Sequence, residues 1–413
     1  MASPDDRTIA AAADRPGLDD LFPPEMRADP YPVYRQLREN APVFDTGRDL
    51  WLVTSYEHCH ALLRDERCSK NPRNMDDYER IMRMTGRTER IRTLLEQLMS
   101  FSDPPHHTRL RGLVQRAFTP RMIEGLRARA ERVANELLEA AGAGDGEIEL
   151  IDQFASRFPL AVIAEMLGVP ASDRERFTRW SRDLAPTFEL ALPPGAAEPA
   201  ERAAEEFIDY FRQLMEVRAK EPRDDLVSGL VHAEDEGRRL EAQELVVNLI
   251  LILGAGHHTA MHMIGNGVLA LVRHPDQLAL LRNLPMDDAI EELLRYESPV
   301  QLTTRFPTDD IAIGGQTIPA GTRLAIILAA GNRDPDRFPD PDRLDLTRGD
   351  RAHLAFGGGI HYCLGNALAR MEAGIAFRAL LDRFPRIELA TEAPEYDATI
   401  LLRGLKALPL AVI

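Results

Sequence analysis

Hydrophobic positions along this chain recur mainly at the spacing of α-helices. Apolar residues return every three or four positions, in segments that end at proline or glycine. The longest such segment, residues 241–273, contains no proline. At 1.5 Å per residue it predicts a helix of roughly 50 Å, the span of a whole domain. Because that helix is also apolar, we expect it in the middle of the fold.

The remaining pattern predicts a mainly α fold with a minor β part, in the α+β class. Further helices are expected at residues 31–39, from 55, 106–118, 123–141, 154–167, 172–184, 200–219 and 364–384, with two short ones after Pro275 and Pro285. Glycine and proline turns predict short strands at residues 43–44, 51–53, within 300–328 and at 403–413. Residues 70–99 predict a long loop with some helix, and residues 1–20 a disordered lead.

Composition narrows the class of protein. The 413 residues carry a formal charge of −16, with 44% hydrophobic and 28% charged residues, as in a soluble globular protein. The acidic balance argues against nucleic acids and anionic membranes as partners. The N-terminus is polar, and the most apolar run, residues 245–256, is shorter than the ~20 residues that span a bilayer. We therefore expect a cytoplasmic protein without a membrane segment.

Three cysteines favour a reducing compartment over a disulfide scaffold. One of them, Cys363, lies in the sequence FGGGIHYCLG at residues 356–365, between a glycine loop and the start of a helix. Free backbone N–H groups and the helix dipole stabilise a thiolate there. Such a cysteine is a metal ligand, a nucleophile with His361 as its base, or a buried structural residue. General arguments leave these three alternatives open.

The spacing F-G-x-G-x-H-x-C-x-G resembles the haem-binding signature of the cytochrome P-450 family at all six fixed positions. The resemblance extends over essentially the whole chain. It implies a single-domain, triangular, mainly helical fold over residues 21–413, with the long central helix over haem. It also implies haem b as the cofactor, Cys363 as the thiolate ligand of its iron, and cofactor contacts from Phe356 and Gly357.

Four basic residues match family positions that bind the two haem propionates. His107 and Arg111 lie four apart in DPPHHTRLR at residues 103–111, and Arg305 and His353 match the other two contributors. Arginine suits this task because its planar fork matches a carboxylate.

The resemblance also identifies a structural ion pair. Glu292 and Arg295 lie three apart and share one helical face. The family buries such a pair and completes it with a third charged group, for which Arg333 or its neighbours are expected. We expect this cluster to stabilise the fold and to do no chemistry.

The central helix carries GAGHHTA at residues 254–260, where the family pattern is A/G-G-x-acid-T. Ala255, Gly256 and Thr259 match, which implies an oxygen-binding groove and a threonine hydroxyl that helps deliver protons. His258 occupies the acidic position. It can relay protons, since imidazole titrates near neutral pH, or turn toward another helix or a substrate. Both alternatives stay open.

A zinc site is a rival interpretation of the same helix. His258 and His262 lie four apart, a spacing that can bind zinc. However, Thr259 stands where a zinc hydrolase has its glutamate, and the sequence indicates no third ligand. The spacing alone therefore does not favour zinc.

The resemblance implies a haem-thiolate monooxygenase that inserts one oxygen atom from dioxygen into a C–H bond, or epoxidises, a small to medium apolar molecule. Electrons are expected from a ferredoxin and its NAD(P)H-dependent reductase. The arginine- and alanine-rich composition resembles actinobacterial enzymes that tailor natural products. One alternative, favoured by His258, is an atypical oxidation: peroxide-driven, oxidative coupling or dehydrogenation. The other is a non-catalytic haem-binding or sensing protein, against which Thr259 argues.

The positions of residues along the chain predict a substrate pocket and a partner-binding surface. The substrate pocket is expected to use Met82, Met84, Leu98, Met99, Leu251, Val300, Thr303, Ile400 and Leu401. Because ferredoxins are usually acidic, a local basic surface is expected on the thiolate side, with Arg109, Arg116, Arg121, Arg348 and Arg370 as candidates.

Overall fold

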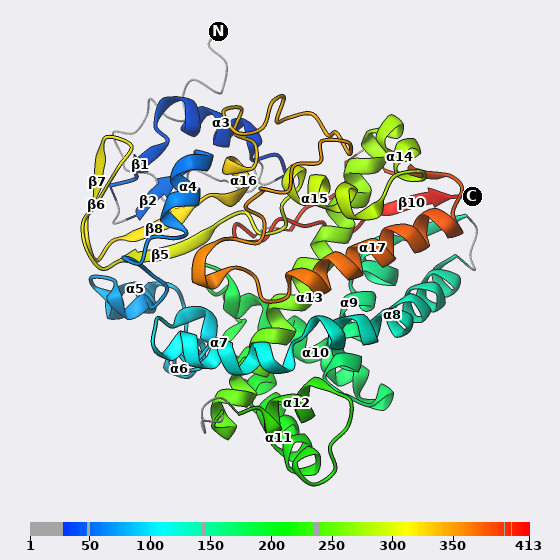
Figure 1. Ribbon diagram of the computed structural model, residues 1–413, viewed down its shortest axis with the longest axis horizontal. Coiled ribbons are helices and arrows are strands. Elements are labelled where there is room, and N and C mark those ends of the chain that lie inside the picture. The colour runs from blue at the N-terminus through cyan, green and yellow to red at the C-terminus, as the bar shows by residue number, and fades with distance from the viewer. Residues whose placement is uncertain (1–27, 48–49, 143–145, 235–239, 392, 398) are drawn as a thin grey trace.

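The computed structural model describes residues 28–47, 50–142, 146–234, 240–391, 393–397 and 399–413. The disordered lead expected at residues 1–20 lies outside these ranges. Most strands gather along one side of the molecule, another strand lies on the opposite side near the C-terminus, and helices fill the rest, with helix α13, Ala242–Arg273, in the middle (Figure 1). The expected mainly α fold with a minor β part is confirmed.

Helix α13 is defined by its ends and by its burial. Glu241 and Glu244 form a capping box at its N-terminus, and it ends at Arg273, before His274 and Pro275. The run at residues 245–256 is part of this 32-residue helix, which by length and composition is apolar enough to cross a membrane. However, 72% of its most apolar window is buried inside the protein. Burial in the core therefore accounts for its hydropathy.

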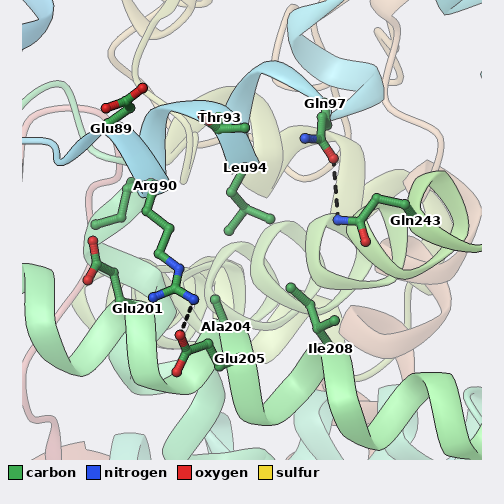
Figure 2. Close-up of a pocket in the computed structure, with 11 residues that line it drawn as sticks. Glu89, Arg90, Thr93, Leu94, Gln97, Glu201, Ala204, Glu205, Ile208 and Gln243 are labelled. Carbon is green, nitrogen blue, oxygen red and sulfur yellow. Dashed lines mark hydrogen bonds and ion pairs between the residues drawn. The ribbon is translucent and has the colours of Figure 1, made fainter.

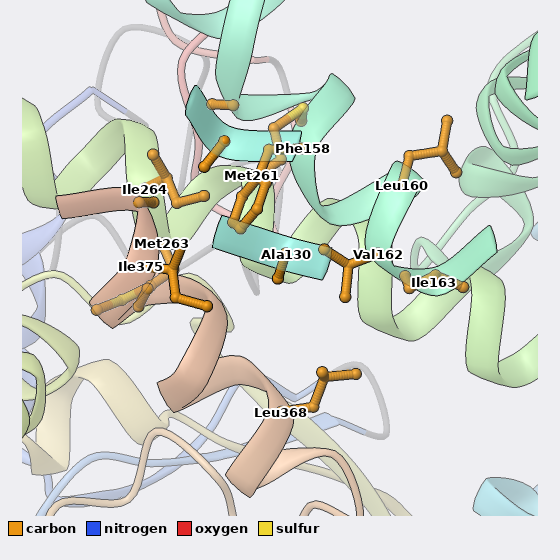
Figure 3. Close-up of a cluster of buried hydrophobic side chains, with 14 of the residues drawn as sticks. Ala130, Phe158, Leu160, Val162, Ile163, Met261, Met263, Ile264, Leu368 and Ile375 are labelled. Carbon is orange, nitrogen blue, oxygen red and sulfur yellow. The ribbon is translucent and has the colours of Figure 1, made fainter. Parts of the chain in front are cut away.

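Helices α9 (Arg157–Met166) and α17 (Asn366–Arg383) pack against α13, and α8 (Pro120–Ala141) packs against both of them. Figure 3 shows part of the buried cluster that they share, with Phe158 from α9, Met261 and Ile264 from α13, and Leu368 from α17. Burying one large apolar side chain of this kind contributes about 1.5–3 kcal/mol. The helical core thus fixes α17, and with it the segment that precedes α17, against α13.

The strands form three small sheets. The largest has the order β1-β2-β8-β5-β3, in which β2 and β8 are parallel and the other pairs antiparallel. Its strands are β1 (Val43–Asp45), β2 (Leu50–Val53), β3 (Cys68–Ser69), β5 (Thr303–Pro307) and β8 (Arg323–Ile326). The smaller sheets hold β4 (Glu147–Glu149), β9 (Ile387–Leu389) and β10 (Pro409–Val412), and β6 (Ile311–Ile313) with β7 (Gln316–Ile318). A strand was expected over residues 403–413, and the observed strand β10 occupies only the last part of that range.

The remaining helices complete the molecule. They are α3 (Tyr31–Asn40), α4 (Tyr56–Leu62), α5 (Tyr78–Met84), α6 (Glu89–Glu96), α7 (His106–Ala117), α10 (Arg174–Leu184), α11 (Ala197–Lys220), α12 (Leu226–His232), α14 (Pro275–Leu281), α15 (Met286–Tyr296) and α16 (Leu328–Gly331). Single helical turns are η3 (Pro72–Asn74), η4 (Met99–Phe101), η5 (Ile151–Ala155), η6 (Ala171–Asp173), η7 (Ala185–Phe188) and η8 (Gly359–His361). The sequence pattern does not predict α12, β4 or β9, which are short.

The expected ion pair is buried in α15. Arg295 donates to both carboxylate oxygens of Glu292 at 2.7 Å, and the two side chains are 0% and 1% exposed. Arg295 also donates to the carbonyl of Asn332, at 2.9 Å. The third charged group is Arg348, whose Nε lies 3.2 Å from Glu292. The expectation of Arg333 is wrong, because Arg333 instead pairs with Asp342.

Candidate functional site

A cavity of about 400 Å³ is enclosed by α13, α7, β5, the start of α17 and the cysteine loop, which we define as residues 356–365. Its volume lies in the range of small-molecule and cofactor sites. Most of its lining is apolar, and its basic side chains come from one wall. The cysteine loop crosses the middle of the molecule close to α13 (Figure 1).

Cys363 lines this cavity at the turn before α17. Its N–H donates to Phe356 O at 3.0 Å, and its carbonyl accepts from Asn366 Nδ2 at 2.7 Å. Burial raises the pKa of the Cys363 thiol, while the Gly365 N–H and the nearby arginines Arg111 and Arg370 act to lower it. The Gly365 N–H thus acts in the direction that the sequence predicts, but burial outweighs it in the protein alone. A metal cation is the partner that holds such a sulfur deprotonated.

Glycines shape the loop that leads to Cys363. Gly357 has φ of +70°, and a Cβ built there would meet nothing within 4 Å, so this side of the loop lies open. Gly359 has φ of +64°, and its Cβ would lie 2.3 Å from Leu63 O. Any side chain at residue 359 would therefore push the loop away from α4. Phe356 and Gly357 line the cavity, as a backbone that approaches a flat ligand requires.

Basic side chains from α7, β5 and the cysteine loop form one wall of the cavity: His107, Arg111, Arg305 and His361. Both ring nitrogens of the buried His107 lack a hydrogen-bond partner within the described part of the chain. An unmet buried polar atom costs about 1–3 kcal/mol, so His107 fits a ligand that brings oxygens. The rings of His107 and His361 lie 4.2 Å apart, and burial and neighbouring cations lower the pKa of His361 to about 2. Two carboxylates suit such crowded basic groups.

His353 does not belong to this wall. Its Nε2 forms a hydrogen bond with Glu291 at 2.8 Å, and its Nδ1 accepts the Ala355 N–H at 3.2 Å. The prediction that His353 contacts the cofactor is therefore wrong, because both of its ring nitrogens are used inside the protein. His361, which sequence reasoning weighed only as a base for the cysteine, lines the cavity instead.

Helix α13 contributes the opposite side of the cavity through Ala255, Gly256 and Thr259. Thr259 Oγ1 donates to Ala255 O at 2.7 Å, one turn back in the helix. This bond fixes the hydroxyl hydrogen on the helix backbone and leaves the oxygen lone pairs to accept a further hydrogen bond.

His258 points toward α10 rather than the cavity. Its Nε2 lies 3.4 Å from Ser181 O and 3.5 Å from Ser181 Oγ, and His258 is not among the cavity-lining residues. Of the two alternatives for His258, the geometry favours the contact with another helix. The rings of His258 and His262 are 6.5 Å apart. Within the ranges that the structure describes, no group of three or more histidine, cysteine or acidic side chains is arranged to hold a metal ion.

The expected substrate contacts divide into two groups. Met99, Leu251, Val300 and Thr303 line the cavity. The expectation is wrong for the other five, which pack elsewhere or are exposed: Met82, Met84, Leu98, Ile400 and Leu401. Met84 is 74% exposed, because α5 turns it outward.

Two ionisable lining residues have no local sequence signal. Lys70 reaches the basic wall from the end of β3, and Glu372 lies on α17. Glu372 is 2% exposed, and its Oε1 is buried without a hydrogen-bond partner in the described chain. Burial raises the pKa of Glu372 well above its usual range, which favours its neutral form. Only contacts between distant segments bring either residue to the cavity.

A second, more open pocket of about 520 Å³ lies between α6 and α11 (Figure 2). Arg90 pairs with Glu205 across it, and Gln243 donates to Gln97 at 3.4 Å. Its polar side chains largely satisfy one another, and it contains none of the predicted site residues. The chemistry of the molecule therefore belongs to the cavity with Cys363.

The fold is mainly helical, and its cavity combines a buried cysteine loop, a threonine on the central helix and a basic wall. This combination is typical of haem-thiolate proteins. The family model for cytochrome P450 matches residues 43–402. The 6-deoxyerythronolide B hydroxylase of Saccharopolyspora erythraea is 40% identical over 401 residues, covering 95% of this chain and 98% of that protein. The cytochrome P450 monooxygenase PikC of Streptomyces venezuelae is 42% identical over 397 residues, covering 94% and 92%. The solved structure of cytochrome P450 PksS of Bacillus subtilis 168 superimposes with a TM-score of 0.86 at 36% identity, covering 95% of this chain and 99% of that one.

The chain belongs to the cytochrome P450 family. It is a haem-dependent monooxygenase, an oxidoreductase that uses dioxygen, an organic substrate and electrons from a redox partner. The expected family, fold and reaction class are thereby confirmed.

Proposed function

We propose that this monooxygenase hydroxylates a polyketide-derived macrolactone or a similarly apolar natural product. The observation that carries the proposal is the cavity itself, in which apolar side chains from α13, α15 and residues 299–300 line the same space as Cys363. The similarity to a 6-deoxyerythronolide B hydroxylase supports the substrate class.

The proposed cofactor is haem b, with Cys363 Sγ as its iron ligand. When bound, the haem supplies the activation of dioxygen. Arg111, Arg305, His107 and His361 bind its two carboxylates through charge-assisted and neutral hydrogen bonds. Gly359 lets the loop lie close to the end of α4, and Gly357 leaves the open side of the loop free, so that its backbone can approach the ring.

Thr259 is the proposed group that positions a proton donor above the site. Its hydroxyl donates to Ala255 O, so its oxygen can accept a hydrogen bond from a water molecule. Leu251, Val300 and Thr303 contact the substrate and set which C–H bond approaches.

The proposed electron donor is a ferredoxin with its NAD(P)H-dependent reductase, in the cytoplasm. Of the five arginine candidates, three are engaged in ion pairs: Arg109 with Glu244, Arg348 with Glu292 and Arg370 with Glu291. Arg116 and Arg121 are exposed at the junction of α7 and α8. Because Arg111 of α7 donates to Tyr362 O, α7 adjoins the cysteine loop. These two arginines therefore lie on elements next to the loop where an acidic partner is expected.

The test is a binding and product experiment with 6-deoxyerythronolide B. The ferric haem should shift toward high spin on titration with the macrolactone, and reconstituted turnover should add one oxygen atom, detected by mass spectrometry. A long-chain fatty acid serves as the apolar control. A spin shift and turnover with the fatty acid but not with the macrolactone would overturn the substrate class. Turnover supported by peroxide but not by ferredoxin would instead favour the atypical oxidation.

A further inference from the structure

The basic wall of the cavity contains a third strongly basic side chain that no family motif indicates. Lys70 follows β3, lines the cavity, and lies beside Arg305, while Arg111 lies on the same wall. Lys70 is one of only three lysines in the sequence, with Lys220 and Lys406. A lysine at this place therefore has a reason other than general composition.

Neither Lys70 nor Arg305 pairs with a carboxylate within the described residues. Lys70 Nζ donates to Thr303 Oγ1 at 3.3 Å and to Thr304 O at 3.2 Å. Arg305 donates to the same two oxygens, at 3.1 and 2.9 Å. Two cations thus share two neutral acceptors, which leaves both positive charges without a counter-charge.

The nearest carboxylate, Asp103, is occupied by other donors. It accepts hydrogen bonds from Ser69 Oγ, from the Lys70 backbone N–H at 2.9 Å and from Asn74 Nδ2 at 3.5 Å. Burial and the charge of Arg305 lower the pKa of the Lys70 ammonium well below its usual range. The negative charge of Asp103 acts in the opposite direction, without a hydrogen bond to Nζ. His361 in the cysteine loop also faces this charge. The wall is therefore short of negative charge.

We propose that Lys70 Nζ binds a carboxylate of the cofactor directly, as a further cation of the propionate site. This inference rests on the proposed cofactor site and deepens it. With Lys70, Arg111 and Arg305 charged, three cations face two carboxylates, and the two neutral histidines add hydrogen bonds without charge. An ammonium gains most from such a contact when it is half-buried, as Lys70 is.

A pH dependence follows from this contact. A bound carboxylate raises the pKa of Lys70 from its lowered value, so binding of the cofactor takes up a proton. Retention of the cofactor is then strongest at a pH below the lowered pKa of Lys70 in the empty site, and it weakens as the pH rises from there through the raised pKa of Lys70 in the loaded site. The charged groups that face Lys70 are Arg305, Arg111 and Asp103, and the two guanidinium groups keep their charge near neutral pH because arginine titrates far above it.

The test measures haem transfer from the loaded protein to excess apomyoglobin. Lys70→Met should lose haem about 10-fold faster than the wild type near neutral pH, since one charge-assisted hydrogen bond is removed. Lys70→Arg should retain haem across the pH range because it keeps its charge. Lys220→Met, which removes an exposed lysine, should behave as the wild type.

A second arm replaces haem with its dimethyl ester, in which both carboxylates are capped. The difference between wild type and Lys70→Met should then disappear. If Lys70→Met loses haem at the wild-type rate, or if the difference persists with the dimethyl ester, Lys70 supports β5 rather than binding a carboxylate and the proposal fails. Substrate identity does not enter these readouts, so they are separate from the test of the proposed function.

Discussion

Single buried charges in this protein are stable where the fold supplies their partners. Glu292 and Arg295 show this most clearly, because both are fully buried and their charged atoms are bound by one another and by carbonyls. An ion pair of the same spacing, Glu124 with Arg127, lies on the surface of α8 with 64% and 44% of its side chains exposed. The two pairs differ mainly in burial.

Glu292→Gln should therefore destabilise the protein by roughly 3–5 kcal/mol, because Arg295 is left as an unpaired buried charge. The surface substitution Glu124→Gln should cost far less, because solvent screens an exposed ion pair. Urea unfolding of the haem-loaded variants, followed by circular dichroism, measures both. Equal losses of unfolding free energy in the two variants would show that burial does not determine how much an ion pair contributes to stability.

Thr259 and His258 are neighbours with different surroundings. Thr259 lines the cavity and His258 faces Ser181. Thr259→Ala should therefore release several-fold more of the consumed reducing equivalents as peroxide, and Thr259→Ser should restore most of the coupling. His258→Ala should leave coupling and its solvent isotope effect nearly unchanged. A larger effect from His258→Ala than from Thr259→Ala would place the proton relay on the histidine.

At the scale of elements, Glu291 joins three parts of the chain around the cysteine loop. From α15 it accepts from His353, in the segment before the loop, and from Arg370 on α17. Although burial acts to raise it, these hydrogen bonds lower the pKa of Glu291 to about 2. The network therefore holds the loop between the two helices.

A lowered carboxyl pKa stabilises the folded state above the unfolded value of 4.5, and this stability is lost as the pH falls from 4.5 toward about 2. Glu291→Gln should lower the free energy of unfolding by about 3 kcal/mol at neutral pH, since each pKa unit is worth about 1.4 kcal/mol. The difference should shrink toward zero in acid. Unfolding curves at several pH values measure this, and a difference independent of pH would contradict it.

Elements with a strong local pattern were predictable, and contacts across the chain were not. The bounds of α13 agree with residues 241–273 to within one residue, because a proline-free apolar segment between clear end signals specifies a helix. The third partner of Glu292 was not predictable, since Arg348 reaches it from a coil without periodicity. Contacts between distant segments also decide which histidine lines the cavity, so the sequence pattern assigned the cofactor contact to His353 instead of His361. For the same reason, no local pattern indicates Lys70.

At the scale of the whole molecule, the net charge of −16 does not exclude a local basic surface. Ile360 and Tyr362 of the cysteine loop are 53% and 37% exposed, which is unusual for large apolar side chains. Arg116 and Arg121 are exposed on the neighbouring helices. An apolar centre with a basic edge suits a small acidic protein.

Reversing Arg116 and Arg121 together to glutamate should raise the ferredoxin concentration needed for half-maximal turnover about 10-fold, since steering by charge is lost. The spin shift on substrate binding should be unchanged. Reversing Arg127 and Arg132 together to glutamate, two exposed arginines elsewhere on α8, is the control matched in charge. Equal effects of the control and of the variant reversed at Arg116 and Arg121 would show that only net charge matters.

Cys363 Sγ is the proposed ligand of the haem iron, and the spectrum of the reduced, carbon-monoxide-bound protein reports on the identity of that ligand. The wild type should show the long-wavelength Soret band of a thiolate adduct. Cys363→Ala should lose that band, while Cys59→Ala, which removes a cysteine buried under α16, should keep it. A Cys363→Ala protein that retained the long-wavelength band would contradict the account.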